Sequence, residues 1–255
     1  MALSQEELER YSRHIILKGV GLSGQKKLLQ GKVLVIGAGG LGAPVLMYLA
    51  ASGVGTLGIM DDDVDRSNLQ RQIIHGTADI GRSKVRSAEV RVKDINPHVE
   101  TVLYEERAEA ENLMEILSKY DFIIDAVDSF ASKFLINDAC VLAKKPFCHG
   151  GIREFQGQVM TYVPGCGPCY RCIFEEIPAD GQIDSCSQAG VLGTMPGIIG
   201  SLQALEAQKY LLGTGDLLTG AMLVFDGLSM EFRKVKFSKA SPSCRVCGEK
   251  ADIKT

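Results

Sequence analysis

The chain has 255 residues, 45% of them hydrophobic, and a formal net charge of −3. It is long enough to bury one large core, and its charge gives no electrostatic case for binding nucleic acid or an anionic membrane. Residues 1–7 lack the basic and apolar regions of a signal peptide, so we expect a cytoplasmic protein. Its eight cysteines then favour metal ligation or catalysis over disulfides.

An uncharged stretch runs from Val33 to Met60 and contains seven glycines and Pro44. Because glycine and proline disfavour helix interiors, the stretch divides into a strand, a turn, a helix and a second strand rather than one membrane span. The turn is Gly37-Ala38-Gly39-Gly40-Leu41-Gly42, and Asp61 follows it by about 20 residues, as in dinucleotide-binding units. Such glycines let the backbone approach a phosphate. The alternative is a glycine-lined packing turn.

Strand and helix signals then continue to alternate. Helices are predicted at 84–95, 108–119 and 131–143, and strands at 99–104, 122–126 and 147–149. Beyond Gly157, strands at 158–163, 222–226 and 231–237 surround a cysteine-rich loop and a helix near 196–212. The pattern predicts an α/β fold with a Rossmann-like, mostly parallel sheet extended by antiparallel strands. We expect one domain over residues 1–255, with a helical arm at 1–30, a nucleotide-binding half at 31–150 and a second half at 151–255.

Charged side chains gather where strands end, which is where open α/β sheets bind ligands. Asp61 and Asp63 follow the strand that ends at Met60, and Asp128 follows the strand at 122–126. Arg71 and Lys84 can stabilise charge that shifts during phosphoryl or nucleotidyl transfer. Together these residues indicate a nucleoside triphosphate and Mg²⁺. Taken singly, Arg71 and Lys84 are also explained as surface charges, and Asp128 as a helix N-cap.

Two Cys-x-x-Cys pairs, Cys169/Cys172 and Cys244/Cys247, can together form a four-thiolate structural Zn²⁺ site. Such a metal would staple the C-terminal tail to the loop after the strand at 158–163. Cys166 forms a competing pair with Cys169, and redox-active or simply buried thiols are the remaining alternative. We predict that Cys140 and Cys148 are packing residues. The four histidines show no metal or triad spacing, and we assign none of them to catalysis.

Four motifs occur in order along the chain: Arg10-Tyr11-Ser12-Arg13-His14-Ile15-Ile16-Leu17, the glycine turn, Ser67-Asn68-Leu69-Gln70-Arg71-Gln72 and Cys169-Tyr170-Arg171-Cys172. From Arg10 to Gly248 the chain resembles the MoeB/ThiF/HesA adenylyltransferases, bacterial relatives of ubiquitin-activating enzymes. The resemblance implies ATP-dependent adenylation of the C-terminal glycine of a small ubiquitin-like sulfur carrier protein (ThiS- or MoaD-like) ending in Gly-Gly. Pyrophosphate would leave, and the sulfur would serve thiamine or molybdopterin biosynthesis. Residues 151–255 would then be the carrier-binding half.

The resemblance also implies residue roles. Asp128 would hold Mg²⁺ and be most needed for adenylation, Asp61 would hold the ribose, and Arg13 would enter the ATP site of a neighbouring subunit in a homodimer. The metal ligands would be Cys169, Cys172, Cys244 and Cys247 rather than Cys166. One departure is Ser129, where the family usually has asparagine. The implied ATP-binding residues are Gly37, Gly39, Gly40, Asp61, Asp63, Asn68, Arg71, Gln72, Lys84 and Asp128, and the implied catalytic residues are Asp128, Arg71, Lys84, Arg13 and Cys186.

Cys186 lies in Asp184-Ser185-Cys186-Ser187-Gln188-Ala189-Gly190. In ThiF-like members a cysteine here is associated with a covalent sulfur link to the carrier, whereas MoeB-like members do not require it. Cys186 and Phe225-Asp226-Gly227 lean towards the ThiF side. The chain ends soon after Cys247, so we expect sulfur from a separate donor, such as a cysteine desulfurase or sulfurtransferase. Two other functions are weighed: an NAD-dependent oxidoreductase and a non-catalytic zinc-containing interaction module.

Overall fold

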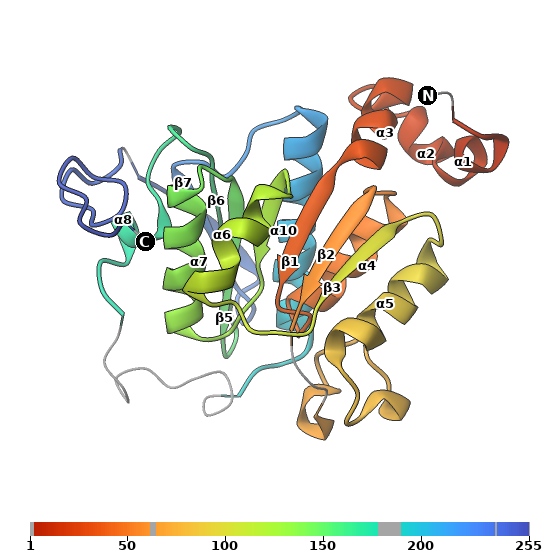
Figure 1. Ribbon diagram of the computed structural model, residues 1–255, viewed down its shortest axis with the longest axis horizontal. Helices are drawn as coiled ribbons and strands as arrows, with labels where there is room; N and C mark the ends of the chain where they lie inside the picture. The colour runs from red at the N-terminus through yellow and green to blue at the C-terminus, as the bar shows by residue number, and fades with distance from the viewer. Residues whose placement is uncertain (1–2, 62–64, 178–189, 238, 255) are drawn as a thin grey trace.

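An eight-stranded mixed sheet forms the centre of the protein (Figure 1). The structure is a computed structural model that describes residues 3–61, 65–177, 190–237 and 239–254. Neighbouring strands are parallel from β3 to β5 and antiparallel from β5 to β8. In spatial order the strands are β3 (Glu100–Tyr104), β2 (Thr56–Met60), β1 (Lys32–Ile36), β4 (Phe122–Asp125), β5 (Phe147–Arg153), β6 (Gln156–Tyr162), β7 (Ala221–Asp226) and β8 (Glu231–Lys236).

Helices cover both faces of this sheet, as Figure 1 shows with α6 and α7 in front and α10 behind. One face carries α4 (Gly42–Ala51), α5 (Lys84–Ile95) and α10 (Thr194–Leu212). The other face carries α6 (Ala110–Ser118), α7 (Phe130–Leu142) and the short α8 (Tyr170–Ile173). The predicted α/β class, with antiparallel strands extending a parallel sheet, is confirmed.

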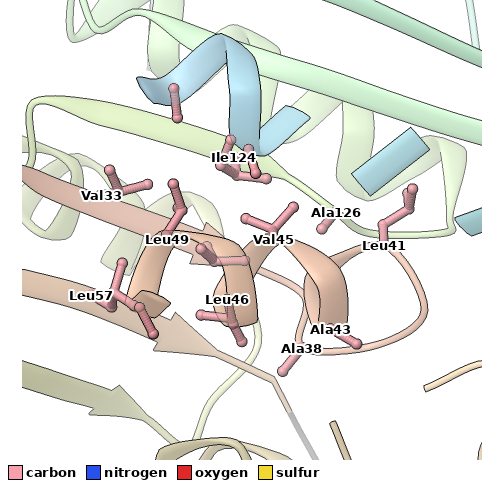
Figure 2. Packing of buried hydrophobic residues seen from close by; sticks show 14 of the residues in the cluster. Val33, Ala38, Leu41, Ala43, Val45, Leu46, Leu49, Leu57, Ile124 and Ala126 are labelled. Atoms are coloured by element: carbon pink, nitrogen blue, oxygen red, sulfur yellow. The ribbon is translucent and has the colours of Figure 1, made fainter. Parts of the chain in front are cut away.

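The core around α4 explains why the glycine-rich stretch folds as it does. Val33, Val35, Leu57 and Ile124 line the sheet under the helix and are fully buried. Figure 2 shows α4 laying its own apolar side chains on these strands. Strands buried on both faces need near-continuous apolar runs, and these runs made β1 and β2 easy to find in the sequence.

The strand order places a switch point between β1 and β4. From β1 the chain winds outward to β2 and β3, and from β4 it winds the other way to β5. The loops after β1 and β4 therefore diverge and leave a crevice at the carboxyl end of the sheet. The glycine turn follows β1, and residues 126–129 follow β4, so both candidate segments meet there.

The N-terminal arm consists of α1 (Gln5–Arg10), α2 (Ser12–Ile15) and α3 (Gly21–Gln30), and lies where the parallel strands begin (Figure 1). Tyr11 anchors it, since its ring is 2% exposed and its hydroxyl accepts a hydrogen bond from Asn96 Nδ2 at 2.8 Å. His14 Nδ1 lies 3.0 Å from the side-chain oxygen of Gln25 on α3. In the described ranges, no helix is long and apolar enough to cross a membrane.

Candidate functional site

A cavity of about 450 Å³ opens at the switch point, over the carboxyl ends of β1, β2 and β4. Its walls come from the glycine turn, the loops after β2, β3 and β4, the first turn of α7 and residues at the start of α10. Eight of the residues singled out in the sequence line it: Gly37, Gly39, Gly40, Asp61, Arg71, Gln72, Lys84 and Asp128. Segments more than 80 residues apart in the chain thus meet around one ligand-sized space.

The turn needs glycine at positions that pack against backbone. Gly37 has φ of +100°, and a Cβ there would lie 2.6 Å from the Ala126 carbonyl oxygen. A Cβ on Gly42 would overlap the carbonyl oxygen of Gly37. The turn therefore lies directly against the loop after β4 and against its own start, so the packing-turn explanation is true as well. It does not exclude a ligand, because Gly39 and Gly40 still line the cavity.

His75 supports the glycine turn from behind, a role that no sequence motif indicated. Its side chain is buried, its Nε2 lies 3.0 Å from the Ala38 carbonyl oxygen, and its Nδ1 lies 2.9 Å from Ser87 Oγ. Because a carbonyl only accepts, Nε2 carries the proton. Burial lowers the pKa of His75, with the nearby Lys84 ammonium adding to the effect against the hydrogen bond to Ala38. A neutral imidazole therefore braces the glycine turn.

Asp61 and Lys84 form a pair on the wall of the cavity. Lys84 Nζ donates to Asp61 Oδ1 at 3.2 Å, and the Ala38 N–H donates to Asp61 Oδ2 at 2.5 Å. Both side chains are mostly buried, with 11% of Lys84 and 14% of Asp61 exposed. The acid thus ties the glycine turn to the start of α5 and keeps a cation at the edge of the cavity.

Arg71 and Gln72 reach the cavity from the loop after η1 (Arg66–Asn68). Arg71 Nη1 donates to the Ser67 carbonyl at 2.9 Å, and the guanidinium carries further N–H donors that suit an anionic ligand. Gln72 is 5% exposed, and its Oε1 accepts no hydrogen bond within the part of the chain that the structure describes. A buried, unsatisfied amide oxygen is costly, so a donor at this spot would stabilise it.

Asp128 is exposed in the cavity and does not cap the following helix. The cap of α7 is Ser129, whose hydroxyl accepts from the Ser132 N–H at 3.1 Å. The N-cap explanation for Asp128 is therefore wrong. Serine is about as good an N-cap as the asparagine that the family resemblance implied here, so Ser129 can fill this position. The Asp128 carboxylate is left to face the cavity.

Two of the described sequence-predicted residues, Asn68 and Arg13, do not line this cavity. The side-chain oxygen of Asn68 instead accepts from the Asp65 N–H at 3.1 Å. Arg13 is exposed on α2, at the opposite end of the sheet. Asp63 and Cys186 lie outside the described residues.

Two cations on the cavity wall were missed by sequence analysis. Arg107 lies in the loop after β3, and Lys133 lies on α7. The position of Arg107 after a strand is a signal that could have been used, because strand ends carry ligand-binding residues. Lys133 gave no such signal, since a lysine one turn into a predicted helix is usually a surface charge.

The four cysteines of the predicted metal site converge where α8 meets the C-terminal tail, since Cys169 is the N-cap of α8 and Cys172 lies within it. All four sulfurs lie within 4.8 Å of one another, with Cys169 Sγ 3.8 Å from Cys172 and 3.7 Å from Cys244, and Cys172 Sγ 3.3 Å from Cys247. A tetrahedral zinc with bonds of about 2.3 Å holds its sulfurs about 3.8 Å apart. The cluster therefore has the composition and size of a four-thiolate zinc site.

The other described cysteines are accounted for. Cys166 is exposed and outside the cluster, so the competing pair is not formed. Cys140 and Cys148 are fully buried, and burial raises the pKa of both thiols well above its usual value. Thiols held protonated in the core pack as small apolar groups, as predicted.

A doubly wound sheet, a glycine turn and opposed charges at the switch point define a nucleotide-binding α/β protein, here with a four-cysteine cluster. The ThiF family model matches residues 11–246, and the chain belongs to this family. It is 46% identical to the SAMP-activating enzyme E1 of Haloferax volcanii over 98% of this chain and 92% of that protein. Identity is also 46% to the sulfur carrier protein adenylyltransferase of Thermus thermophilus, covering 98% and 94%.

Other relatives are longer than this chain. The probable adenylyltransferase/sulfurtransferase MoeZ of Mycobacterium tuberculosis is 48% identical over 93% of this chain, which spans 62% of MoeZ. Among solved structures, E. coli MccB superposes with a TM-score of 0.83 over 97% of this chain and 74% of MccB. At 22% identity this likeness establishes the fold alone.

Proposed function

We propose that this protein is an adenylyltransferase. It uses ATP to adenylate the C-terminal carboxylate of a small ubiquitin-like sulfur carrier protein ending in Gly-Gly, and it releases pyrophosphate. The observation that carries the proposal is the single cavity that joins the glycine turn, Arg71, Lys84 and Asp128 at the switch point. Relatives of nearly the same length, named for the activation of such carriers, support it. The oxidoreductase and interaction-module alternatives have no comparable support.

The reaction needs positioning and charge rather than proton transfer. The carrier's carboxylate is already ionised at neutral pH, so it attacks the α-phosphorus directly, forming an acyl–phosphate bond as the bond to pyrophosphate breaks. The glycine turn offers backbone N–H groups to the phosphates. Arg71 and Lys84 stabilise the negative charge that gathers on the departing pyrophosphate. Asp61 is proposed to hold the ribose.

Asp128 has the chemistry expected of a Mg²⁺ ligand. Its carboxylate is exposed in the cavity, and Mg²⁺ is usually held by one or two carboxylates together with phosphate oxygens. When bound, the ion would neutralise phosphate charge beside Asp128. Zn²⁺ is proposed at the four cysteines, where it would tether the C-terminal tail to α8.

Arg13 is proposed to act across a homodimer. The residue is exposed on the N-terminal arm, where Tyr11 is hydrogen-bonded to Asn96 in the body of the chain and His14 to Gln25 on α3. The arm therefore presents Arg13 outward, at the end of the sheet away from its own cavity. A second subunit would have to bring its cavity to this arginine.

The carrier is proposed to bind on residues 151–255, with its tail entering the cavity past Ile152, Val191 and Pro196, which line one side. Cys186 is proposed to link to the carrier through sulfur, as in ThiF-like members, with the sulfur coming from a separate donor. Thiamine and molybdopterin biosynthesis are the two candidate destinations.

ATP–pyrophosphate exchange tests the proposal directly. The purified protein, with MgATP and labelled pyrophosphate, should form labelled ATP only when a ThiS- or MoaD-like carrier is added. The matched control is the same carrier lacking its terminal Gly-Gly. Exchange that is equal with the truncated carrier, or absent with every intact carrier offered, would exclude carrier adenylation.

A further inference from the structure

Lys133 is a buried lysine in the wall of the cavity, with 6% of the residue exposed. Its Nζ donates to the Val127 carbonyl at 2.6 Å and to the Gly150 carbonyl at 2.7 Å, and lies 3.5 Å from Asp125 Oδ1. Two of the three N–H donors of the ammonium are thus given to backbone carbonyls, and its charge is paired with the Asp125 carboxylate. Lys133 is therefore held by groups of the protein, although it borders the cavity.

Asp125 and His149 complete a buried network behind Lys133. Asp125, the last residue of β4, accepts from His149 Nδ1 at 2.7 Å and from the Val127 N–H at 3.3 Å. Burial raises the pKa of Asp125, but the Lys133 ammonium and the His149 hydrogen bond outweigh it and lower the pKa overall. Burial and the Lys133 charge lower the pKa of His149. The network thus holds one cation, one anion and a neutral imidazole.

A side chain from α10, on the opposite face of the sheet, also holds the end of β4 and the first part of β5. Gln203 on α10 donates through Nε2 to the carbonyl oxygens of Asp125 at 2.7 Å and Cys148 at 3.1 Å. A Cβ on Gly150 would overlap the Gln203 side chain, so the β5 backbone has no room to move that way. The end of β4 and the adjoining first part of β5 are therefore held from both faces of the sheet, and Asp128 follows shortly after this held segment.

We propose that Lys133, held by Asp125, is a positioning residue that fixes the Val127–Asp128 peptide and so aims the Asp128 carboxylate into the cavity. The inference rests on the proposed adenylation. Lys133 holds the carbonyl immediately before Asp128, while Asp125 holds the N–H of Val127, so both ends of this residue are tied to one ion pair. Loss of the Lys133–Asp125 ion pair would leave the Asp128 carboxylate exposed but no longer held in its orientation towards the cavity.

A double-mutant cycle between Lys133→Met and Asp128→Ala tests this role. In the wild-type background, Lys133→Met should lower the kcat/KM of carrier-dependent pyrophosphate exchange by about 10- to 100-fold, because misplacement by about 1 Å has effects of this size. In the Asp128→Ala background it should lower exchange by less than about twofold, since the group that Lys133 aims is gone. Equal losses in both backgrounds, or no loss in the first, would overturn the proposal.

Lys145→Met is the matched control. Lys145 also donates to two backbone carbonyls, those of Ser118 at 3.0 Å and Tyr120 at 2.8 Å, but at the opposite end of the sheet. It should change thermal stability and leave the kcat/KM of exchange unchanged when assayed below its melting temperature. A similar fall in exchange for Lys145→Met would show that any lost lysine clamp has this effect, and would count against a special role for Lys133.

The same cycle is measured on MgATP binding by calorimetry, which does not need a carrier. If wild-type protein binds MgATP but shows no exchange, the proposed function fails, and the coupling between Lys133 and Asp128 in binding still decides the positioning role. If Lys133→Met does not fold, Asp125→Asn takes its place, since it keeps the size of the side chain and removes the charge that holds Lys133. Coupling of Asp125→Asn to Asp128→Ala supports the role, and independence refutes it.

Discussion

At the ends of β1, β2 and β4, charged side chains surround an open cavity of about 450 Å³. Beyond β6 and β8, four cysteine sulfurs converge within 4.8 Å of one another and together supply all four ligands of a tetrahedral structural zinc. The first arrangement lines an open cavity with charged groups, whereas the second directs all four of its sulfurs at one another. We therefore expect changes in the parallel half to cost activity at little cost in stability, and changes in the cysteine cluster to do the opposite.

The largest effect is expected for Asp128→Ala. Removing one preorganised charge stabiliser from such a site typically costs about 10²–10³-fold in rate, and a lost Mg²⁺ ligand should fall at the upper end. Because Ser129 caps α7, the melting temperature should stay within about 2 °C of wild type. Pyrophosphate exchange and calorimetry measure the two quantities. The control is Asp121→Ala, an exposed acid at the other end of the sheet. A large fall in melting temperature for Asp128→Ala would contradict the expectation that changes at the cavity cost activity and not stability.

Next in size is Arg13→Ala, with an expected loss of about 10²-fold in exchange. Mixing refolded Arg13→Ala and Asp128→Ala chains sharpens the test, because a heterodimer would hold one site with Asp128 from one chain and Arg13 from the other. Exchange should then recover to about a quarter of wild type, since half of randomly mixed dimers are heterodimers with one complete site. No recovery, in a mixture shown to contain heterodimers, would place Arg13 in its own chain's site or outside catalysis.

In the second half, Cys244→Ser should release the metal and lower the melting temperature. Cys169 and Cys244 are 75 residues apart, and closing a long loop is typically worth about 2–4 kcal/mol. For a chain of this size that corresponds to a fall of roughly 4–16 °C. Metal analysis and calorimetry check both points. The matched control is Cys166→Ser, an exposed cysteine outside the cluster, which should keep its zinc and its melting temperature. Zinc retained by Cys244→Ser would require a different ligand set.

Elements marked by local sequence signals could be predicted, whereas those that depend on contacts between distant residues could not. The end of strand β2 at Met60 and both bounds of helix α5 were predicted as observed. An apolar run marks the strand, and Asn96-Pro97 directly after Ile95 ends the helix, so both signals are local. Strand β5 was predicted to end at His149 but continues to Arg153. Gly150 and Gly151 suggest a turn, yet they pair with Val159 and Gln158 in the sheet. Gln203 fills the space above Gly150, and that contact is 53 residues away in the sequence.

The residues of the site also fall into those that sequence patterns could identify and those that they could not. Gly37, Lys84 and Asp128 could be found because each follows a recognisable strand or starts a recognisable helix. Lys133 and His149 could not be found, because their roles depend on Asp125, which lies eight residues from Lys133 and 24 from His149 and is buried between two strands. Local patterns indicate groups that face a ligand, whereas the groups that hold them in place are known only from packing.

The smallest expected effect is on the pH dependence of stability, and it tests the buried Lys133–Asp125–His149 network rather than the groups that face the ligand. Because the pKa of His149 is lowered in the folded protein, the unfolded chain binds a proton below the ordinary value of 6.5 while the folded chain resists it. The contribution of His149 to stability is therefore fully present above about pH 6.5 and is lost as the pH falls towards its folded pKa. Asp125, whose pKa is lowered from 3.8, contributes a constant amount between pH 5 and 7.

His149→Gln should therefore flatten the fall in melting temperature between pH 7 and 5 by about 2–4 °C, the equivalent of about 1 kcal/mol. Part of the slope of melting temperature against pH should remain in this variant, because burial also lowers the pKa of His75. Cys148→Ala is the control, because it removes packing on the same strand from a thiol whose pKa is raised far above this range. Cys148→Ala should lower the melting temperature at every pH by a similar amount and leave its dependence on pH as in the wild type. Parallel curves for His149→Gln and Cys148→Ala would mean that His149 is not held neutral, and the charge balance assigned to the network would be wrong.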